Sequence, residues 1–225
     1  MIRFVFLDID DTFFDFAWQE DQGLHRAYAE LGIPLPDDMF ARYHEINQLW
    51  WEKHERGEVS RDELVLARHR QLFEEFGLDA DPAAVETSYR RYLGIGYRFL
   101  PHAEEILHYL RPKYRLYVAS NGVASTQYSR LESAGLLDFF DGIFISEELG
   151  AIKPSAEFFE RAFAQIPGFR ADEAILIGDS ISSDILGGMR AGMKTVWYNS
   201  RKRPPVEGIR PDYTIDSLLE LREIL

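Results

Sequence analysis

The sequence contains no cysteine. This absence excludes disulfide bonds, thiolate metal sites and a cysteine nucleophile, and it favours a reducing compartment, so we expect a cytoplasmic protein. Long hydrophobic runs are also missing, since none approaches the roughly 18–20 apolar residues that cross a bilayer. The apolar start at residues 2–7 leads directly into acidic residues, which argues against a signal peptide.

Positive charge is scarce as well. The chain has 25 Lys and Arg against 38 Asp and Glu, a formal net charge of −13. Because nucleic acid duplexes and anionic membranes are bound through basic stripes, we expect neither as a partner. A small phosphorylated substrate stays compatible with this balance, because a metal ion and one or two cations can reverse the field locally. With 46% hydrophobic residues, the 225-residue chain can bury a sizeable core.

Short apolar runs without polar alternation are typical of strands that are buried on both faces of a parallel sheet. They occur at residues 3–9, 116–119, 142–145, 174–177 and 194–198. Helical patterns separate the later runs, which predicts an α/β fold with a doubly wound parallel sheet. Residues 15–98 contain several helical patterns and no strand. We therefore expect an α/β core from residues 1–14 and 99–225, interrupted by an all-helical insertion over 15–98.

Four short polar strings follow the ends of the apolar runs. In parallel sheets, ligands bind at the carboxyl ends of the strands. The strings are DIDDT at residues 8–12, SNG at 120–122, KP at 153–154 and GDSISSD at 178–184. Asp8 and Asp10 leave the strand end on the same side. Two carboxylates so close are costly unless a cation or a proton lies between them. Together with Asp179 and Asp184, they form an oxygen-rich set that suits a hard divalent ion.

Each string also has an ordinary structural explanation. Asp is common in turns and at helix N-termini, Ser120 and Asn121 fit as plain helix caps, and a single Lys153 is typical of solvated surface. The specific signal is the order of the four strings and their placement at strand ends.

In this order, and with a helical insertion after the first strand, the strings resemble the haloacid dehalogenase-like (HAD) hydrolase superfamily over the whole chain. The resemblance implies a Rossmann-like core and a mobile helical cap over residues 15–98. It also implies a Mg²⁺-dependent phosphomonoester hydrolase. Asp8 would be the nucleophile that forms an aspartyl-phosphate. Asp10 would protonate the leaving oxygen and then activate water.

The same resemblance implies roles for the other strings. Ser120 and Asn121 would hold phosphoryl oxygens, and Lys153 would neutralise the charge that develops on them. Mg²⁺ would lie between the Asp8 carboxylate, the main-chain carbonyl of Asp10 and Asp179, with Asp184 as a further ligand or as a group that orients one. The sequence departs from the common pattern where Asp11 replaces a frequent Gly and Ser120 a frequent Thr. Because Asp tolerates left-handed turns, we expect the geometry to survive.

An acid two residues after the first favours phosphate esters over a 2-haloacid dehalogenase reaction. In the insertion and the segment leading to it, Phe14, Asn47 and Trp51 are candidate substrate contacts, although such aromatic residues also fit as the cap's own core. Residues 10–16, 46–51 and 145–148 resemble a bacterial branch of pyrimidine nucleotide 5′-nucleotidases, which implies pyrimidine (deoxy)nucleoside monophosphates as substrates.

The alternatives are a sugar-phosphate or phosphoglycolate phosphatase, a phosphomutase, and a non-enzymatic phospho-acceptor module. We expect a monomer or a weak homodimer. Residues 201–203, Arg-Lys-Arg, are interpreted as a solvated loop that could graze a phosphate.

Overall fold

The computed structural model describes residues 1–225, which divide into two compact units. Unit 1 contains residues 1–17 and 96–225, and unit 2 contains residues 18–95. The insertion expected from the sequence, residues 15–98, extends three residues beyond unit 2 at each end. The difference has a cause in the main chain, because the segment leaving unit 1 pairs with the one returning to it. The Asp15 N–H donates to the Arg98 carbonyl over 2.8 Å, and Phe14 forms a bridge with Phe99.

Unit 1 is built on a six-stranded sheet in which every neighbouring pair is parallel, in the order β3-β2-β1-β4-β5-β6. The strands are β1 (Phe4–Leu7), β2 (Arg115–Ser120), β3 (Gly142–Ile145), β4 (Ala174–Gly178), β5 (Lys194–Tyr198) and β6 (Tyr213–Ile215). The prediction of a doubly wound parallel sheet is confirmed, and each of the five apolar runs overlaps a strand.

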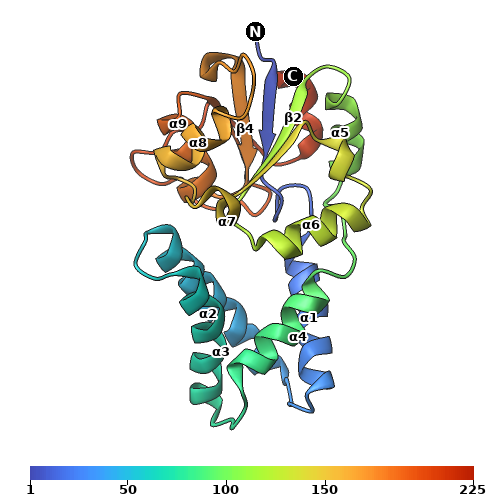
Figure 1. Cartoon of the computed structure of the whole chain (residues 1–225), viewed down its shortest axis with the longest axis vertical. Coiled ribbons are helices and arrows are strands. Elements are labelled where there is room, and N and C mark those ends of the chain that lie inside the picture. Colours follow the sequence, from blue (N-terminus) through green and yellow to red (C-terminus); the bar gives the residue numbers. More distant parts are fainter. The chain divides into compact units, whose positions relative to one another are not determined.

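Helices cover both faces of this sheet (Figure 1). One face packs against α5 (Ala103–Leu110), α6 (Ala124–Ser133) and α10 (Leu221–Ile224), and the other against α8 (Ala156–Phe163) and α9 (Leu186–Arg190). In β1, Val5 and Leu7 join the first core, whereas Phe4 and Phe6 join the second. Because both faces are buried, the strand sequences show no polar alternation.

Short turns of helix complete unit 1. They are η1 (Leu137–Phe139), α7 (Ser146–Leu149), η2 (Ala171–Glu173), the π-helical turn η3 (Ile181–Ile185) and η4 (Leu218–Glu220).

Unit 2 is all helical. Its helices are α1 (Phe16–Glu30), which starts in unit 1, α2 (Asp37–Glu55), α3 (Arg61–Phe76) and α4 (Pro82–Leu93). Helices α1 and α3 are followed by Gly32 and Gly77 with φ of 66° and 63°, the left-handed conformation that glycine adopts without a steric penalty. No helix of the chain combines the length and the apolar character needed to cross a membrane.

The interior of unit 2 contains a network of buried polar side chains. Arg68 donates to Asn47 Oδ1 over 2.8 Å and to Glu86 Oε2 over 2.6 Å. Asn47 Nδ2 in turn donates to Glu20 Oε1 over 2.7 Å. Burial lowers the pKa of His69, which also lies 3.2 Å from Glu86 Oε2, to about 4. The network therefore joins α1, α2, α3 and α4 through matched charges and hydrogen bonds.

Candidate active site

The strings that follow β1, β2 and β4 meet at one edge of the sheet. Leu7 of β1 pairs with Val118 of β2 on one side and with Ile177 of β4 on the other. Asp8, the next residue, donates its N–H to the Ile177 carbonyl over 3.0 Å. The chain builds the sheet outward from β1 on one side and then returns to β1 on the other, so this edge is a topological switch point.

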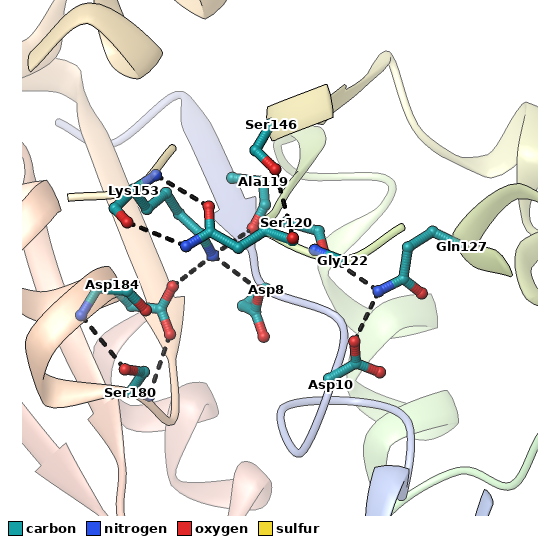
Figure 2. Close-up of polar contacts among 12 residues, drawn as sticks. Asp8, Asp10, Ala119, Ser120, Gly122, Gln127, Ser146, Lys153, Ser180 and Asp184 are labelled. Carbon is teal, nitrogen blue, oxygen red and sulfur yellow. Dashed lines mark hydrogen bonds and ion pairs between the residues drawn. The ribbon is translucent and has the colours of Figure 1, made fainter. Parts of the chain in front are cut away.

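Lys153 lies at the centre of this edge (Figure 2). Its ammonium group donates to Asp8 Oδ1 over 2.8 Å, to Asp184 Oδ1 over 2.6 Å and to the Ala119 carbonyl over 2.6 Å. An ammonium has three N–H donors, so each has an acceptor and the charge is fully buried. Although burial alone would lower it, the carboxylates of Asp184 and Asp8 raise the pKa of Lys153 above its ordinary value. Lys153 is therefore a fixed positive charge in this site.

Asn121 fixes the main chain of Lys153. Its side-chain oxygen accepts the Lys153 N–H over 2.9 Å, and its side-chain nitrogen donates to the Lys153 carbonyl over 3.0 Å. Ser146 at the start of α7 donates to the Asn121 carbonyl over 3.3 Å. The sequence assigned Asn121 to phosphoryl oxygens, but these contacts use its carboxamide to hold the residue that carries the positive charge.

The π-helical turn η3 directs Asp184 into the site. Asp184 Oδ2 accepts the Ser180 N–H over 3.0 Å, and the side chain is fully buried. Gly178 leaves the space that this carboxylate fills, because a Cβ there would lie 2.2 Å from Asp184 Oδ2. Glycine at the end of β4 is thus a steric requirement of the site.

Asp8, Asp179 and Asp184 form a cluster in which a carboxylate oxygen from each lies within 4.8 Å of the others. Burial raises the pKa of Asp8, with Lys153 opposing this effect and Asp184 adding to it. Burial, Asp184 and Asp11 raise the pKa of Asp179 to about 7, against the opposing Arg203. Once ionised, the three carboxylates exceed their two cations, Lys153 and Arg203, by one negative charge. This donor set fits Mg²⁺, which takes oxygen ligands.

Asp10 is held by two side chains of α6 that the sequence analysis missed. Gln127 Nε2 donates to Asp10 Oδ2 over 2.6 Å and to Ser120 Oγ over 3.1 Å. The buried Arg130 forms an ion pair with Oδ1 of the partly exposed Asp10 and donates to Gln127 Oε1 over 3.0 Å. A sequence signal existed, because a glutamine and an arginine three residues apart, on the helix after the SNG string, share one face.

Ser120 already accepts two hydrogen bonds, from Gln127 and from the Gly122 N–H at 3.0 Å. A hydroxyl has one proton and two lone pairs. With both lone pairs used, its remaining capacity is to donate, which suits an anionic oxygen.

The loop at residues 199–203 also reaches the acidic turns, although its arginines were interpreted as solvated. Arg201 pairs with Asp11 Oδ2 over 2.7 Å, and Arg203 donates to Asp179 Oδ2 over 2.8 Å. Asp11 has a φ of 55°, so the expected left-handed turn is present without glycine. Both arginines are partly exposed.

The three candidate substrate contacts occupy different environments. Phe14 is fully buried in unit 1, where its ring packs against Tyr97 and Phe99. The carboxamide of Asn47 is used within unit 2 by the buried network described above. Phe14 and Asn47 therefore belong to the interiors of their units, which is the alternative role that the sequence allowed. Trp51 is half-buried on α2, with its ring near His54.

The raised pKa of Asp179 predicts a pH-dependent stability difference in protein treated with EDTA. A native carboxyl with a raised pKa keeps a proton that the unfolded chain has already released, so stability falls as pH rises from about 4 to about 7. In chemical denaturation, Asp179→Asn should match the wild type near pH 4 and exceed it by on the order of 4 kcal/mol at pH 8, because the native pKa is raised to about 7.

Excess Mg²⁺ should reverse that order at pH 8, because the ion stabilises only the protein that retains its carboxylate ligand. A stability difference that does not change between pH 5 and pH 8 would contradict the assignment of a raised pKa to Asp179.

Comparison with known proteins supports the resemblance of these polar strings to those of the haloacid dehalogenase-like hydrolases. A family model described as "haloacid dehalogenase-like hydrolase" matches residues 2–192. The chain is 42% identical to the HAD-hydrolase YfnB of Bacillus subtilis, covering 99% of this chain and 95% of that protein. The magnesium-bound crystal structure of YfnB superimposes with a TM-score of 0.95, covering 100% of this chain and 98% of that one.

Two further relatives are named as pyrimidine 5′-nucleotidases. PynA of Streptococcus pneumoniae is 34% identical, covering 99% of this chain and 94% of that protein. YjjG of Escherichia coli is 31% identical, covering 98% and 96%. With the family model matching most of its length and these relatives matching almost all of it, the chain belongs to the haloacid dehalogenase-like hydrolase family.

Proposed function

We propose that this protein is a Mg²⁺-dependent phosphomonoester hydrolase that acts through an aspartyl-phosphate on pyrimidine (deoxy)nucleoside monophosphates. The observation that carries the chemistry is the buried ammonium of Lys153, which joins Asp8 and Asp184 beside Asp179. Buried acids with strongly shifted pKa values at a sheet edge are typical of reactive sites.

In the first step, a carboxylate oxygen of Asp8 attacks phosphorus and the bond to the leaving alcohol oxygen breaks. The proton that this oxygen needs comes from Asp10. Lys153 reduces the repulsion between nucleophile and phosphate through its charge. One of its N–H groups can reach a phosphoryl oxygen only by giving up one of the three acceptors it now has. The Ser120 hydroxyl donates to a phosphoryl oxygen.

In the second step, Asp10 takes a proton from water as the water attacks phosphorus. The acyl–phosphate bond breaks, phosphate leaves and the Asp8 carboxylate is restored. Asp10 must therefore be oriented in both steps, which gives the contacts from Gln127 and Arg130 a chemical purpose.

A divalent cation held by Asp8, Asp179, Asp184 and the Asp10 carbonyl would supply Lewis-acid neutralisation of the anionic phosphate. Because the site has more acids than cations, binding of a dianionic phosphate without that cation would add repulsion to an already negative site.

The nucleotide part of the proposal rests on the relatives named as pyrimidine 5′-nucleotidases and on the half-buried Trp51 of unit 2. Among the candidate contacts, Trp51 remains suitable for stacking on a base, since Phe14 and Asn47 are used in packing and hydrogen bonding. A sugar-phosphate or phosphoglycolate phosphatase would use the same core chemistry and differ only in the group that recognises the alcohol.

The nucleophile is tested by Asp8→Asn, which keeps an oxygen that can accept from Lys153. We expect activity on UMP to be abolished, and the acid-quenched protein to carry no label from ³²P-labelled UMP. Asp10→Asn should lower turnover by about 10²–10⁴-fold, because both proposed steps need its proton transfer. The exposed Asp172→Asn, whose carboxylate pairs with Arg170, is the matched control. Turnover by Asp8→Asn would refute the covalent mechanism.

Arg130→Met tests the orientation of Asp10. We expect kcat/KM for UMP to fall by roughly 10–100-fold, because a misplaced acid protonates a poor leaving group badly. For p-nitrophenyl phosphate, whose leaving group hardly needs a proton, kcat/KM should change much less. Equal losses on both substrates, or a loss of folded protein by circular dichroism, would assign Arg130 a structural role only.

Trp51→Ala tests base recognition in a panel of dUMP, dTMP, UMP, AMP and a sugar phosphate, with and without Mg²⁺. Loss of stacking on a base should raise KM for the pyrimidine nucleotides by about 5–100-fold, and leave the sugar phosphate unchanged. Trp50→Ala is the matched control, because its indole donates to Gln71 and its ring is covered by Lys53. Equal, weak turnover of all nucleotides by the wild type would favour the sugar-phosphate alternative.

A further inference from the structure

The loop after β5 brings a second cation to the carboxylate cluster. Arg203 Nη2 donates to Asp179 Oδ2 over 2.8 Å and to the Asp179 carbonyl over 2.5 Å. The same carbonyl accepts the indole N–H of Trp197, from β5, over 2.9 Å. Both the main chain and the side chain of Asp179 are therefore fixed from the neighbouring strand and its loop.

Arg203 is itself held by a buried residue. Asn199, the first residue after β5, accepts the Arg203 N–H over 2.8 Å and donates to the Arg203 carbonyl over 2.9 Å. The Asn199 N–H is anchored on the Ile215 carbonyl of β6 over 2.8 Å. The loop that presents the guanidinium is thus tied to the sheet at a defined place.

This construction repeats the one at Lys153. In each case an asparagine at the end of a strand forms two hydrogen bonds with the main chain of a cationic residue, and that residue reaches an acid of the cluster. An ordinary exposed ion pair contributes little and needs no such support. The repeated arrangement indicates that the position of the Arg203 guanidinium matters to Asp179.

These contacts involve only one of the two oxygens of the Asp179 carboxylate. Arg203 occupies Oδ2, whereas Oδ1 is used by none of these donors. A carboxylate with one oxygen hydrogen-bonded presents the other in a fixed direction, and partners of this kind commonly control metal affinity.

We propose that Arg203, held by Asn199, is a positioning residue that fixes the Asp179 carboxylate so that Oδ1, the oxygen that Arg203 does not contact, faces the divalent cation. This inference rests on the proposed Mg²⁺ site. Arg203 would then have a role beyond that of a solvated loop residue. For Mg²⁺ affinity, the gain from orienting the Asp179 carboxylate would exceed the cost of repulsion between the guanidinium and the metal.

The test is the Mg²⁺ dissociation constant, measured by isothermal titration calorimetry on the full chain at one pH and without substrate. Arg203→Met and Arg203→Lys should both bind Mg²⁺ about 10–100-fold more weakly than the wild type. Lysine keeps the charge, but it cannot reproduce the directed contacts of the guanidinium. Saturating Mg²⁺ should restore kcat in both variants with an unchanged KM for substrate.

Lys202→Met is the matched control, since it removes a charge from the same loop at a side chain that is 80% exposed. Its Mg²⁺ affinity should equal that of the wild type. Circular dichroism and the melting temperature in EDTA establish that each variant is folded.

Three outcomes overturn the inference. Unchanged affinity in both Arg203 variants would show that Asp179 needs no such partner. Tighter binding by Arg203→Met with no change in Arg203→Lys would show an effect of charge alone. A wild-type protein that binds no Mg²⁺ would instead refute the metal site of the proposed function, and with it this inference.

Discussion

The ion pairs of the Lys153 ammonium with Asp8 and Asp184 are the interactions on which the rest of the site depends. An uncompensated charge inside a protein costs several kcal/mol, so neither carboxylate would be tolerated at this depth without a cation and directed hydrogen bonds. Much of the surrounding structure serves that contact: Asn121 fixes the lysine main chain, and Gly178 leaves room for the second acid. The parallel register of β1 with its two neighbours then brings Asp8 to the same edge of the sheet.

The two units use buried charge in opposite ways. In unit 2, Arg68 and His69 offset the burial of Glu86, and its pKa is lowered to about 2. In unit 1, burial and neighbouring acids raise the pKa of Asp179 to about 7 despite Arg203. The first network pairs the buried Glu86 with Arg68 and His69 and holds four helices together. The second has more carboxylates than cations, which makes it the place where an added cation would gain most. This contrast, which involves no relative, supports the proposal that the acids of unit 1 are reactive and that Glu86 is structural.

Asp10 and Asp179 are each held by the guanidinium group of an arginine. Gln127 and Arg130 of α6 contact the Asp10 carboxylate, whereas Arg203, in the loop after β5, contacts the Asp179 carboxylate. In both cases a guanidinium helps to set the direction of the carboxylate. Asp8, the proposed nucleophile, differs from these two acids, because its contact is with the ammonium of Lys153, which binds Oδ1 and not the other oxygen.

The sequence by itself determined the sheet, the helical insertion and the acids at the strand ends, because these depend on local patterns: continuous apolar runs, glycine stops and residues adjacent to a strand. Only the tertiary structure decided which polar groups meet. Arg130 lies 120 residues from Asp10, and Arg203 lies 24 residues from Asp179, so no local pattern pairs them. The same holds for Asn47 and Arg68, whose contact across two helices turned a candidate substrate contact into part of a core. A side chain's chemistry is written in the sequence, but its hydrogen-bond partner is fixed only when packing brings distant segments together.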